Sequence, residues 1–247
     1  PPDLSDFRIT YWVGGDGIAL GNVRAMVQDQ DGYLWLAANV GLVRFDGLRF
    51  AVMDITSGAK PLPVAPCRAL YLARDGSLWV GYGNGQGLYH IVHGEVRDVY
   101  RQNQIDGSIN AIAEDSDGTV GGGHDQGLHR FRGGAWESIR VSSGKDQRVF
   151  DIHEDRTHNL WVATATGLYR RTGASGFEAV SPGEGIVRAI SEDANGQAWV
   201  TDELGGFRRA GTSDRNHLFD GSGVSLFHDR EGNLWVATNG QGLWQVQ

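Results

Sequence analysis

Several residue types and patterns are scarce in this chain of 247 residues, and each scarcity removes a class of protein. The single cysteine, Cys67, can form no internal disulfide, so cysteine usage does not indicate a redox compartment. A small buried apolar role is favoured for it over a reactive thiol. No stretch approaches the roughly 20 apolar residues that a membrane helix needs, and no signal peptide is recognised. No window keeps the helical period over a useful length, which predicts that helix is nearly absent.

An excess of positive charge is also missing. The chain has 22 Lys and Arg residues against 30 Asp and Glu residues, which gives a net charge of −8. Such a balance does not favour a surface that binds phosphates or anionic membranes, and it excludes nucleic acid as the expected partner. Only 6 residues are proline, whereas 37 are glycine, a ratio that fits many tight turns.

One motif recurs along the whole chain at a period of about 40 residues. Each copy has a short alternating run, a turn rich in Asp, Asn and Gly, an apolar run around a tryptophan, and a Gly-Leu step that opens a third strand. A second tight turn then leads to a fourth strand. Six copies are found, and the third has lost the tryptophan. The aligned positions are Trp35, Trp79, Gly121, Trp161, Trp199 and Trp235.

Four short strands per copy predict an all-β fold, a β-propeller of four-stranded antiparallel blades. We expect residues 1–247 to form a single domain of six blades. The last copy ends after its third strand, and the segment near residues 7–12 alternates like a fourth strand. A ring without exposed sheet edges would therefore close with this N-terminal strand in the sixth blade. The alternative is part of a seven-bladed ring.

The recurrent residues have structural explanations. The Asp that lies six residues before most of the tryptophan positions is expected to form an Asx-type turn with nearby backbone amides, because no copy has the oxygen-rich loop of a calcium site. The tryptophan is expected in the core between blades. The eight histidines are dispersed, and His90 and His93 would point to opposite faces of a strand. We expect no metal and no cofactor.

The loops between second and third strands vary most from copy to copy. They are polar, rich in amides and spaced by glycine, which suits hydrogen bonding to a polar small molecule at the mouth of the channel. Ordinary surface loops are the alternative. The candidate ligand-binding residues in these loops are Asn39, Tyr82, Asn84, Gln86, His124, Asp125, Gln126, Asn239 and Gln241.

The second residue of the innermost strand provides a further candidate site. Three copies place arginine there, and a ring could bring these side chains together to bind a carboxylate or phosphate. The alternative is that each arginine pairs with an acid or carbonyl of the adjoining blade. The polar residues at this position are Arg24, Arg68, Asn110 and Arg188, whereas Phe150 and Val224 occupy it in the other two copies.

The motif Asp-x-x-Gly-x-Leu-Trp-Val-Ala-Thr followed by Gly-Leu resembles the two-component regulator propeller repeat. The run from Phe7 through residues 31–35 to residues 45–50 is similar to the beginning of such sensors. The resemblance covers nearly the whole chain, with the third and fifth copies as the loosest. It implies an extracytoplasmic or periplasmic sensor part of a bacterial histidine kinase, hybrid sensor or diguanylate cyclase.

The sequence therefore favours a non-enzymatic sensory propeller that binds a small polar ligand, such as a saccharide or an organic anion, or a partner protein. One alternative is a propeller-based lyase or glycosidase that uses His124 or an acid such as Asp125, Asp202 or Glu203. A structural or protein-interaction scaffold is another. The sequence does not determine the ligand, the output domain or the oligomeric state, nor whether the chain is a fragment or a free-standing protein.

Overall fold

The structure is a computed structural model. Its described part contains 23 β-strands and no helix, as the absence of helical periodicity predicts. No helix long and apolar enough to span a bilayer is therefore present among these residues. The described residues are 20–53, 61–101, 107–142, 147–173, 176–180, 185–203, 206–212, 216–217, 223–228, 234–238 and 243–246.

The strands follow the six copies of the motif in order. The first three copies contain β1 (Val23–Gln28), β2 (Leu34–Ala38), β3 (Gly41–Phe45), β4 (Phe50–Val52), β5 (Cys67–Leu72), β6 (Leu78–Tyr82), β7 (Leu88–Val92), β8 (Glu95–Tyr100), β9 (Ile109–Glu114), β10 (Val120–His124), β11 (Gly127–Arg132) and β12 (Ala135–Ile139). The last three contain β13 (Val149–Glu154), β14 (Leu160–Thr164), β15 (Gly167–Thr172), β16 (Gly176–Ala179), β17 (Val187–Glu192), β18 (Ala198–Asp202), β19 (Gly206–Arg209), β20 (Asn216–His217), β21 (Gly223–His228), β22 (Leu234–Thr238) and β23 (Leu243–Val246).

Each copy forms one antiparallel sheet whose strands pair in sequence order, which confirms the propeller of four-stranded blades. The predicted number of complete blades is wrong, because five sheets have four strands and the sixth, β21 to β23, has three. The physical reason is that this copy ends at its third strand. The segment near residues 7–12 that was predicted to complete it lies outside the described residues.

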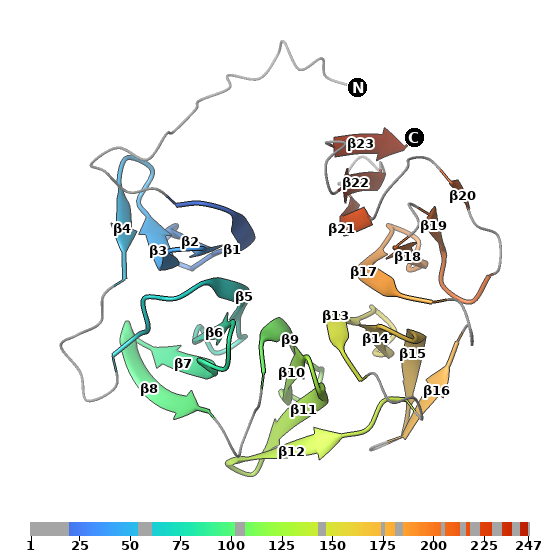
Figure 1. Ribbon diagram of the computed structural model, residues 1–247, viewed down its shortest axis with the longest axis horizontal. Helices are drawn as coiled ribbons and strands as arrows, with labels where there is room; N and C mark the ends of the chain where they lie inside the picture. The colour runs from blue at the N-terminus through green and yellow to red at the C-terminus, as the bar shows by residue number, and fades with distance from the viewer. Residues whose placement is uncertain are drawn as a thin grey trace.

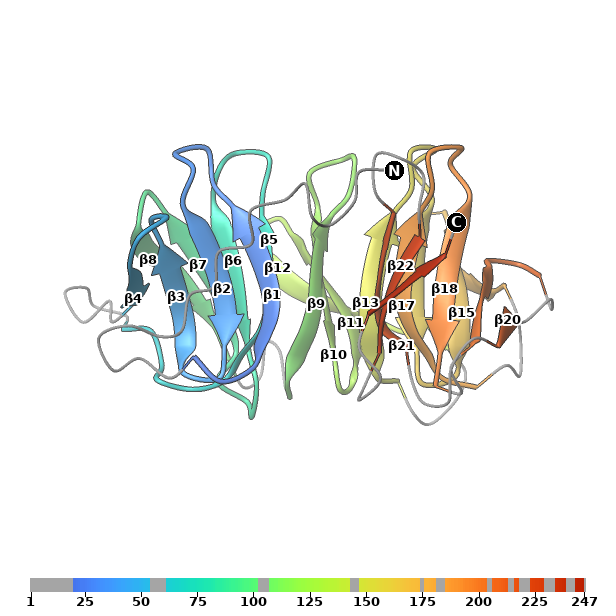
Figure 2. The same cartoon turned by 90° about the horizontal axis from the view of Figure 1, so that it is seen from above.

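The blades stand side by side around a central axis, with the first strand of each nearest the centre (Figure 1). Neighbouring innermost strands contact one another from β1 through β5, β9, β13 and β17 to β21. The strands run between two opposite faces of the arc (Figure 2). One face carries the tight turns between first and second strands. The other carries the turns between second and third strands and the connections between blades.

The Asx-turn prediction is confirmed in the copies described. In the fourth blade, Asp155 Oδ1 accepts hydrogen bonds from the backbone N–H groups of Thr157 and Asn159, both at 2.9 Å. The other oxygen, Oδ2, accepts the indole N–H of Trp161 at 2.8 Å. The carboxylate therefore closes the turn and orients the tryptophan.

The core lies between the blades, where the tryptophans were expected. Trp35 packs with Leu70 and Leu78 of the second blade, and Trp161 packs with Ile190 of the fifth. Burying such aromatic area is the largest favourable contribution that single side chains make to a fold of this kind. Cys67 is also fully buried in this core, as expected for an unreactive thiol, and burial raises its pKa.

The face with the tight turns holds a further connection between blades, which the sequence analysis missed. The last residue of an innermost strand is glutamate in three copies, and its carboxylate accepts a backbone N–H from the turn of the preceding blade. Glu114 accepts a hydrogen bond from the backbone N–H of Arg74 at 2.9 Å, and Glu154 accepts one from that of Ser116 at 2.7 Å. Glu192 takes that of Arg156 at 3.1 Å.

Candidate functional site

The second residue of every innermost strand is a β-bulge. In all six sheets the pairing with the second strand skips this residue, so that, for example, Cys67 pairs with Tyr82 and Ala69 with Gly81. A bulge bends the strand and re-aims the side chain of the unpaired residue, and such features occur often beside functional sites. The skipped residues are Arg24, Arg68, Asn110, Phe150, Arg188 and Val224.

Arg68 and Asn110 form the best-connected part of this ring. Arg68 Nη1 donates to Asn110 Oδ1 at 3.0 Å, and Asn110 Nδ2 donates to the Val149 carbonyl at 3.1 Å. These bonds join the second, third and fourth blades at the face with the interblade connections. Gly83 leaves room for the arginine, since a Cβ there would lie 3.0 Å from Arg68 Nε.

Asp125 completes this cluster from the turn between β10 and β11. Its Oδ1 accepts Asn110 Nδ2 at 3.2 Å, and its Oδ2 accepts the backbone N–H of Ser108 at 3.1 Å. Burial favours the neutral acid, but the hydrogen bonds from Asn110 and Ser108 and the charge of Arg68 outweigh it, and the pKa of Asp125 lies below its usual value. The carboxylate is therefore ionised at neutral pH and balances Arg68.

Arg188 lies in a second cluster, on the fifth blade. Its Nη2 atom donates to Glu203 Oε1 at 3.1 Å, and its guanidinium carbon lies 4.3 Å from the centre of the Phe150 ring. Stacking on an aromatic face and pairing with a carboxylate are both typical of arginine. The side chain of Arg188 keeps 31% of its surface exposed, so it is not sealed from solvent.

The other predicted site residues differ in accessibility. Arg24 is exposed at the start of β1, and Asn39, Asn84 and Gln126 are exposed in their turns, whereas Gln86 is half-buried. Asn84 has a positive φ of 56°, and its backbone N–H donates to Ser108 Oγ at 3.2 Å. This bond joins the loop after β6 to the connection before β9.

Tyr82 and His124 are packed inside the blades. Both are fully buried, Tyr82 against the ring of Tyr89 and His124 against that of His129. The pKa of Tyr82 is raised by its removal from water. Their binding role stays a prediction, and these positions offer no side-chain surface to a ligand. Asn239 and Gln241 lie outside the described residues.

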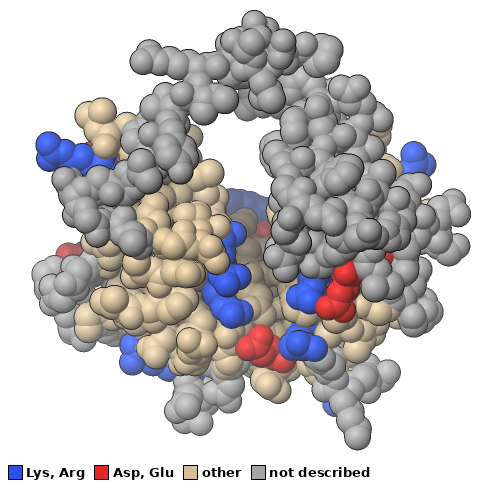
Figure 3. All heavy atoms as spheres, turned by 45° about the horizontal axis from the view of Figure 1, so that its top comes forward, with Lys and Arg blue, Asp and Glu red and all other residues tan. Residues whose placement is uncertain are grey.

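The surface of this region carries both signs of charge. Figure 3 shows basic side chains along the walls of the central hollow, with acidic side chains beside them. Arg68 and Arg188 therefore have structural partners, as the alternative reading of the sequence expected. Each arginine also remains partly exposed, so a ligand anion can compete for it. Among the described residues no three His, Cys, Asp or Glu side chains are grouped to hold a metal ion.

Sequence reasoning missed several members of these clusters. Ser108 contacts Asn84 of the preceding blade and Phe150 contacts Arg188 of the next, and the sequence gives no signal for such contacts. Asp151 is another, because its Oδ2 accepts the backbone N–H of Ile190 in the fifth blade at 2.9 Å. A signal did exist for Asp151, since the equivalent position is Ala or Ser in every other copy.

The sheets, their radial order and their repeated turns define a β-propeller built from one sequence motif. Two stretches, residues 17–39 and 221–240, match the model of the family described as two component regulator propeller. The chain thus carries repeats of this family, in agreement with the resemblance seen in its motif. No curated protein sequence matches the chain.

Solved structures with the same fold come from sensors and from enzymes. An extracellular domain assigned to a hybrid two component system of B. thetaiotaomicron is 20% identical, with a TM-score of 0.65 over 93% of this chain and 38% of that one. The catalytically inactive H270A virginiamycin B lyase from Staphylococcus aureus with quinupristin is 18% identical, with a TM-score of 0.71 over 97% of this chain and 84% of that one. An ancestral GH74 enzyme is 13% identical, with a TM-score of 0.70 over 91% of this chain and 36% of that one.

These similarities establish the fold alone, because identity is low and one fold hosts many functions. The chain spans 38% of the length of the sensor domain.

Proposed function

We propose that this chain is a non-enzymatic, extracytoplasmic sensory propeller that binds a small polar anion at the channel mouth. The observation that carries the proposal is the bulge, which presents the second residue of every innermost strand in the same way and places arginine there in three blades. The family repeats and the extracellular sensor domain of similar fold support the sensory role and the location.

The chemistry of the ring suits a carboxylate or phosphate. Arg24 and Arg68 stand on the neighbouring strands β1 and β5, and Arg24 is exposed. A guanidinium offers parallel N–H donors that match both oxygens of a carboxylate or phosphate. Exposed Asn39 and Asn84 add amide groups to the same face, so a sugar acid or another hydroxylated anion would find donors and acceptors beyond its charged group.

Signalling would follow from the contacts that the ligand replaces. Arg68 bonds to Asn110 in the next blade, and Asn110 bonds to Val149 in the one after. An anion that takes Arg68 would weaken this connection and favour a different placement of the blades or of an adjoining domain. Such a shift requires a difference in ligand affinity between the two states.

The test is a thermal-shift screen of organic acids, phosphates and mono- and oligosaccharides, followed by titration of any hit. A ligand that binds the native state raises the melting temperature by mass action. The variant R24A/R68A/R188A should remove the shift while keeping most of the stability. The matched control R49A/R97A/R209A removes the same charge at other positions and should keep the shift. An unchanged affinity in the first variant would disprove the site.

The enzyme alternative has a specific similarity behind it, since the lyase fold covers 97% of this chain. The arrangement of its candidate groups supports it less. His124 is fully buried and Asp202 is nearly so, while Asp125 and Glu203 are engaged with Asn110 and Arg188. Turnover of any binding compound, followed by mass spectrometry, distinguishes the two functions.

We also propose that the chain forms one propeller domain and that the segment near residues 7–12 closes the ring as the fourth strand of the sixth blade. The reason is that, in the described part of the chain, β23 is the last strand of a three-stranded sheet, and a fourth strand would pair with that edge. Removal of residues 1–12 should then lower the melting temperature. An unchanged melting temperature would disprove closure by this segment without affecting the ligand site.

A further inference from the structure

The third blade lacks an interaction that the equivalent turns of three other blades make. The indole N–H donates to the turn carboxylate from Trp35 to Asp29 at 2.7 Å, from Trp161 to Asp155 at 2.8 Å and from Trp199 to Asp193 at 3.0 Å. In the third blade the carboxylate is Asp115, and Gly121 stands where the tryptophan would be.

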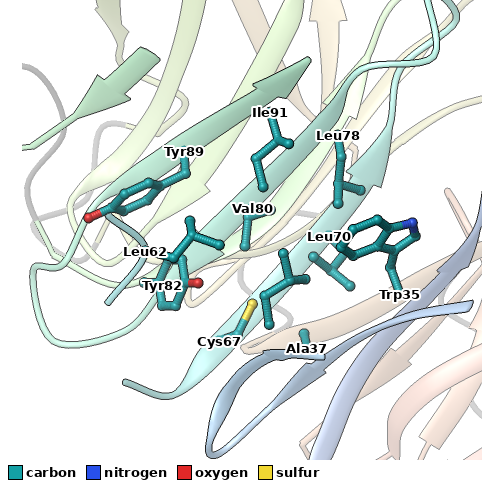
Figure 4. Close-up of a cluster of buried hydrophobic side chains, with 11 residues drawn as sticks. Trp35, Ala37, Leu62, Cys67, Leu70, Leu78, Val80, Tyr82, Tyr89 and Ile91 are labelled. Carbon is teal, nitrogen blue, oxygen red and sulfur yellow. The ribbon is translucent and has the colours of Figure 1, made fainter. Parts of the chain in front are cut away.

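The first blade shows what surrounds a tryptophan at this position. Trp35 projects from β2 toward Leu70 and Leu78 of the second blade, and Ile91 belongs to the same buried cluster (Figure 4). Aligning the repeats places Ile152, Leu160 and Arg171 of the fourth blade at the positions of these three residues. An equivalent aromatic side chain on β10 would therefore enter the space between the third and fourth blades.

A cavity of about 30 Å³ is found in that space. Its lining includes Gly121 and the three fourth-blade residues that the alignment identifies, and Leu128 and Phe177 add apolar surface. A Cβ atom on Gly121 would meet no atom closer than 3.8 Å, so nothing blocks a group at this point. The enclosed volume exceeds what one water molecule needs, about 10–15 Å³ by this kind of measure.

The cavity opens onto a larger polar cleft of about 560 Å³ on the face with the tight turns. Asp115, Thr119, Arg130 and Arg171 line both spaces, so the two are continuous. The cleft is thus apolar at its inner end and charged at its mouth. It lies on the opposite face from the bulged arginines of the channel mouth.

At the mouth, an arginine occupies the carboxylate oxygen that accepts an indole N–H in other blades. Arg171 Nη1 contacts Asp115 Oδ2 at 2.8 Å, the oxygen that accepts an indole N–H in the other blades. Arg130 pairs with Glu137 at 3.0 Å, and Arg132 is exposed. Three guanidinium groups and the carboxylates of Asp115 and Asp117 line the cleft, so it presents charged donors and acceptors side by side.

We propose that this cleft binds a small aromatic carboxylate with a ring N–H, of the indole-carboxylate class. The ring enters beside Gly121 among Leu128, Ile152 and Leu160, in the place of the missing tryptophan. Its N–H replaces the guanidinium at Asp115 Oδ2. Arg171 then turns to the ligand carboxylate together with Arg132. The ligand restores the interaction that the sequence of this blade has lost, and the site is independent of the channel mouth.

The experiment titrates the full chain with indole-3-acetate by calorimetry. Saturable binding is expected, at least tenfold tighter than for indole, which lacks the carboxylate, and for 1-naphthaleneacetate, which lacks the N–H. G121W should raise the melting temperature and abolish binding, because the new side chain fills the site. G121A leaves most of the space and should keep measurable binding. The R132A substitution should weaken the binding of indole-3-acetate at least threefold and leave the affinity for indole unchanged.

The absence of binding to the folded wild-type chain at millimolar concentration would overturn the proposal, as would equal affinity in the wild type and G121W. Equal affinities for all three compounds would overturn the assigned chemistry. If G121W does not fold, G121L fills the inner end with a smaller side chain, and retained affinity there counts against the site. Because the R24A/R68A/R188A variant should bind indole-3-acetate normally, failure at one site is distinguished from failure at the other.

Discussion

Trp161 donates its indole N–H to Asp155 at 2.8 Å, and both residues are more than nine-tenths buried. The same carboxylate holds two backbone amides of the turn through its other oxygen. This pair therefore connects the tight turn of a blade to the core between blades. Its energetic contribution can be measured by itself, because the chain offers a tryptophan without such a partner.

Replacing Trp161 with phenylalanine should destabilise the fold by about 2–3 kcal/mol, because a buried hydrogen bond to a charged acceptor is lost. The control is W136F. The Trp136 indole nitrogen is buried and has no hydrogen-bond partner among the described residues, so its removal costs less. Urea unfolding of both variants checks the prediction, and equal losses would contradict it.

Asp155 should make the fold sensitive to acid. Burial opposes its ionisation, but hydrogen bonds from Trp161, Asn159 and Thr157 prevail and lower its pKa from 3.8 to about 2. A lowered pKa gives stability that is present above pH 4 and is lost as the pH falls through 2. The loss should be about 2 kcal/mol. Urea midpoints of the wild type and D155N between pH 2 and 5 should converge as the pH falls.

Asp151 should act in a different pH range and with the opposite sign. Removal from water raises its pKa from 3.8 to about 6, against the hydrogen bonds from Ile190 and Ile152. The folded state then binds the proton more tightly than the unfolded state between pH 4 and 6. Its contribution to stability therefore falls as the pH rises through this window, by up to about 3 kcal/mol.

The D151N variant isolates this effect, because two half-buried histidines titrate over a neighbouring range. Removal from water lowers the pKa of His153 and of His90, so each of them adds stability as the pH rises. The unfolding free energy of the wild type minus that of D151N should decrease as the pH rises from 4 to 6. A difference that stays constant over this range would exclude the assigned titration.

The glutamate connections between turns should stabilise the packing of adjacent blades. Glu154 has a side chain only 10% exposed and accepts the N–H of Ser116 at 2.7 Å. E154A should lower the unfolding free energy by about 1.5–3 kcal/mol, and E154Q should lose less because its carbonyl oxygen can still accept. E137A removes a glutamate that is 49% exposed and should cost less than about 1 kcal/mol. Thermal unfolding of the three variants provides the measurement.

Two glycines with similar backbone angles should respond differently to alanine. Gly87 and Gly94 have φ values of 90° and 79°, so both substitutions pay the left-handed cost of about 1–2 kcal/mol. A Cβ on Gly87 would also lie 2.2 Å from the Tyr100 carbonyl oxygen, whereas one on Gly94 meets nothing within 4 Å. G87A should therefore be the more destabilising by several kcal/mol. Equal melting temperatures would contradict this steric account.

The sequence by itself determined the repeat, the strand order within each blade and the role of the Asp and Trp in the first, fourth and fifth copies. These features rest on local turn chemistry and on strand alternation, which a single copy already encodes. The same alignment identified the second position of the innermost strand. It also identified Gly121 as an exception.

Only the tertiary structure decided what those positions do. Arg68 meets Asn110, Asp151 meets Ile190, and Arg171 meets Asp115 across blade boundaries, between residues about 40 or more positions apart in the chain. A repeat pattern does not encode contacts between blades, because each contact depends on how far one sheet is rotated against the next. The number of complete blades is of this kind too, since it depends on which strand reaches the edge of the last sheet.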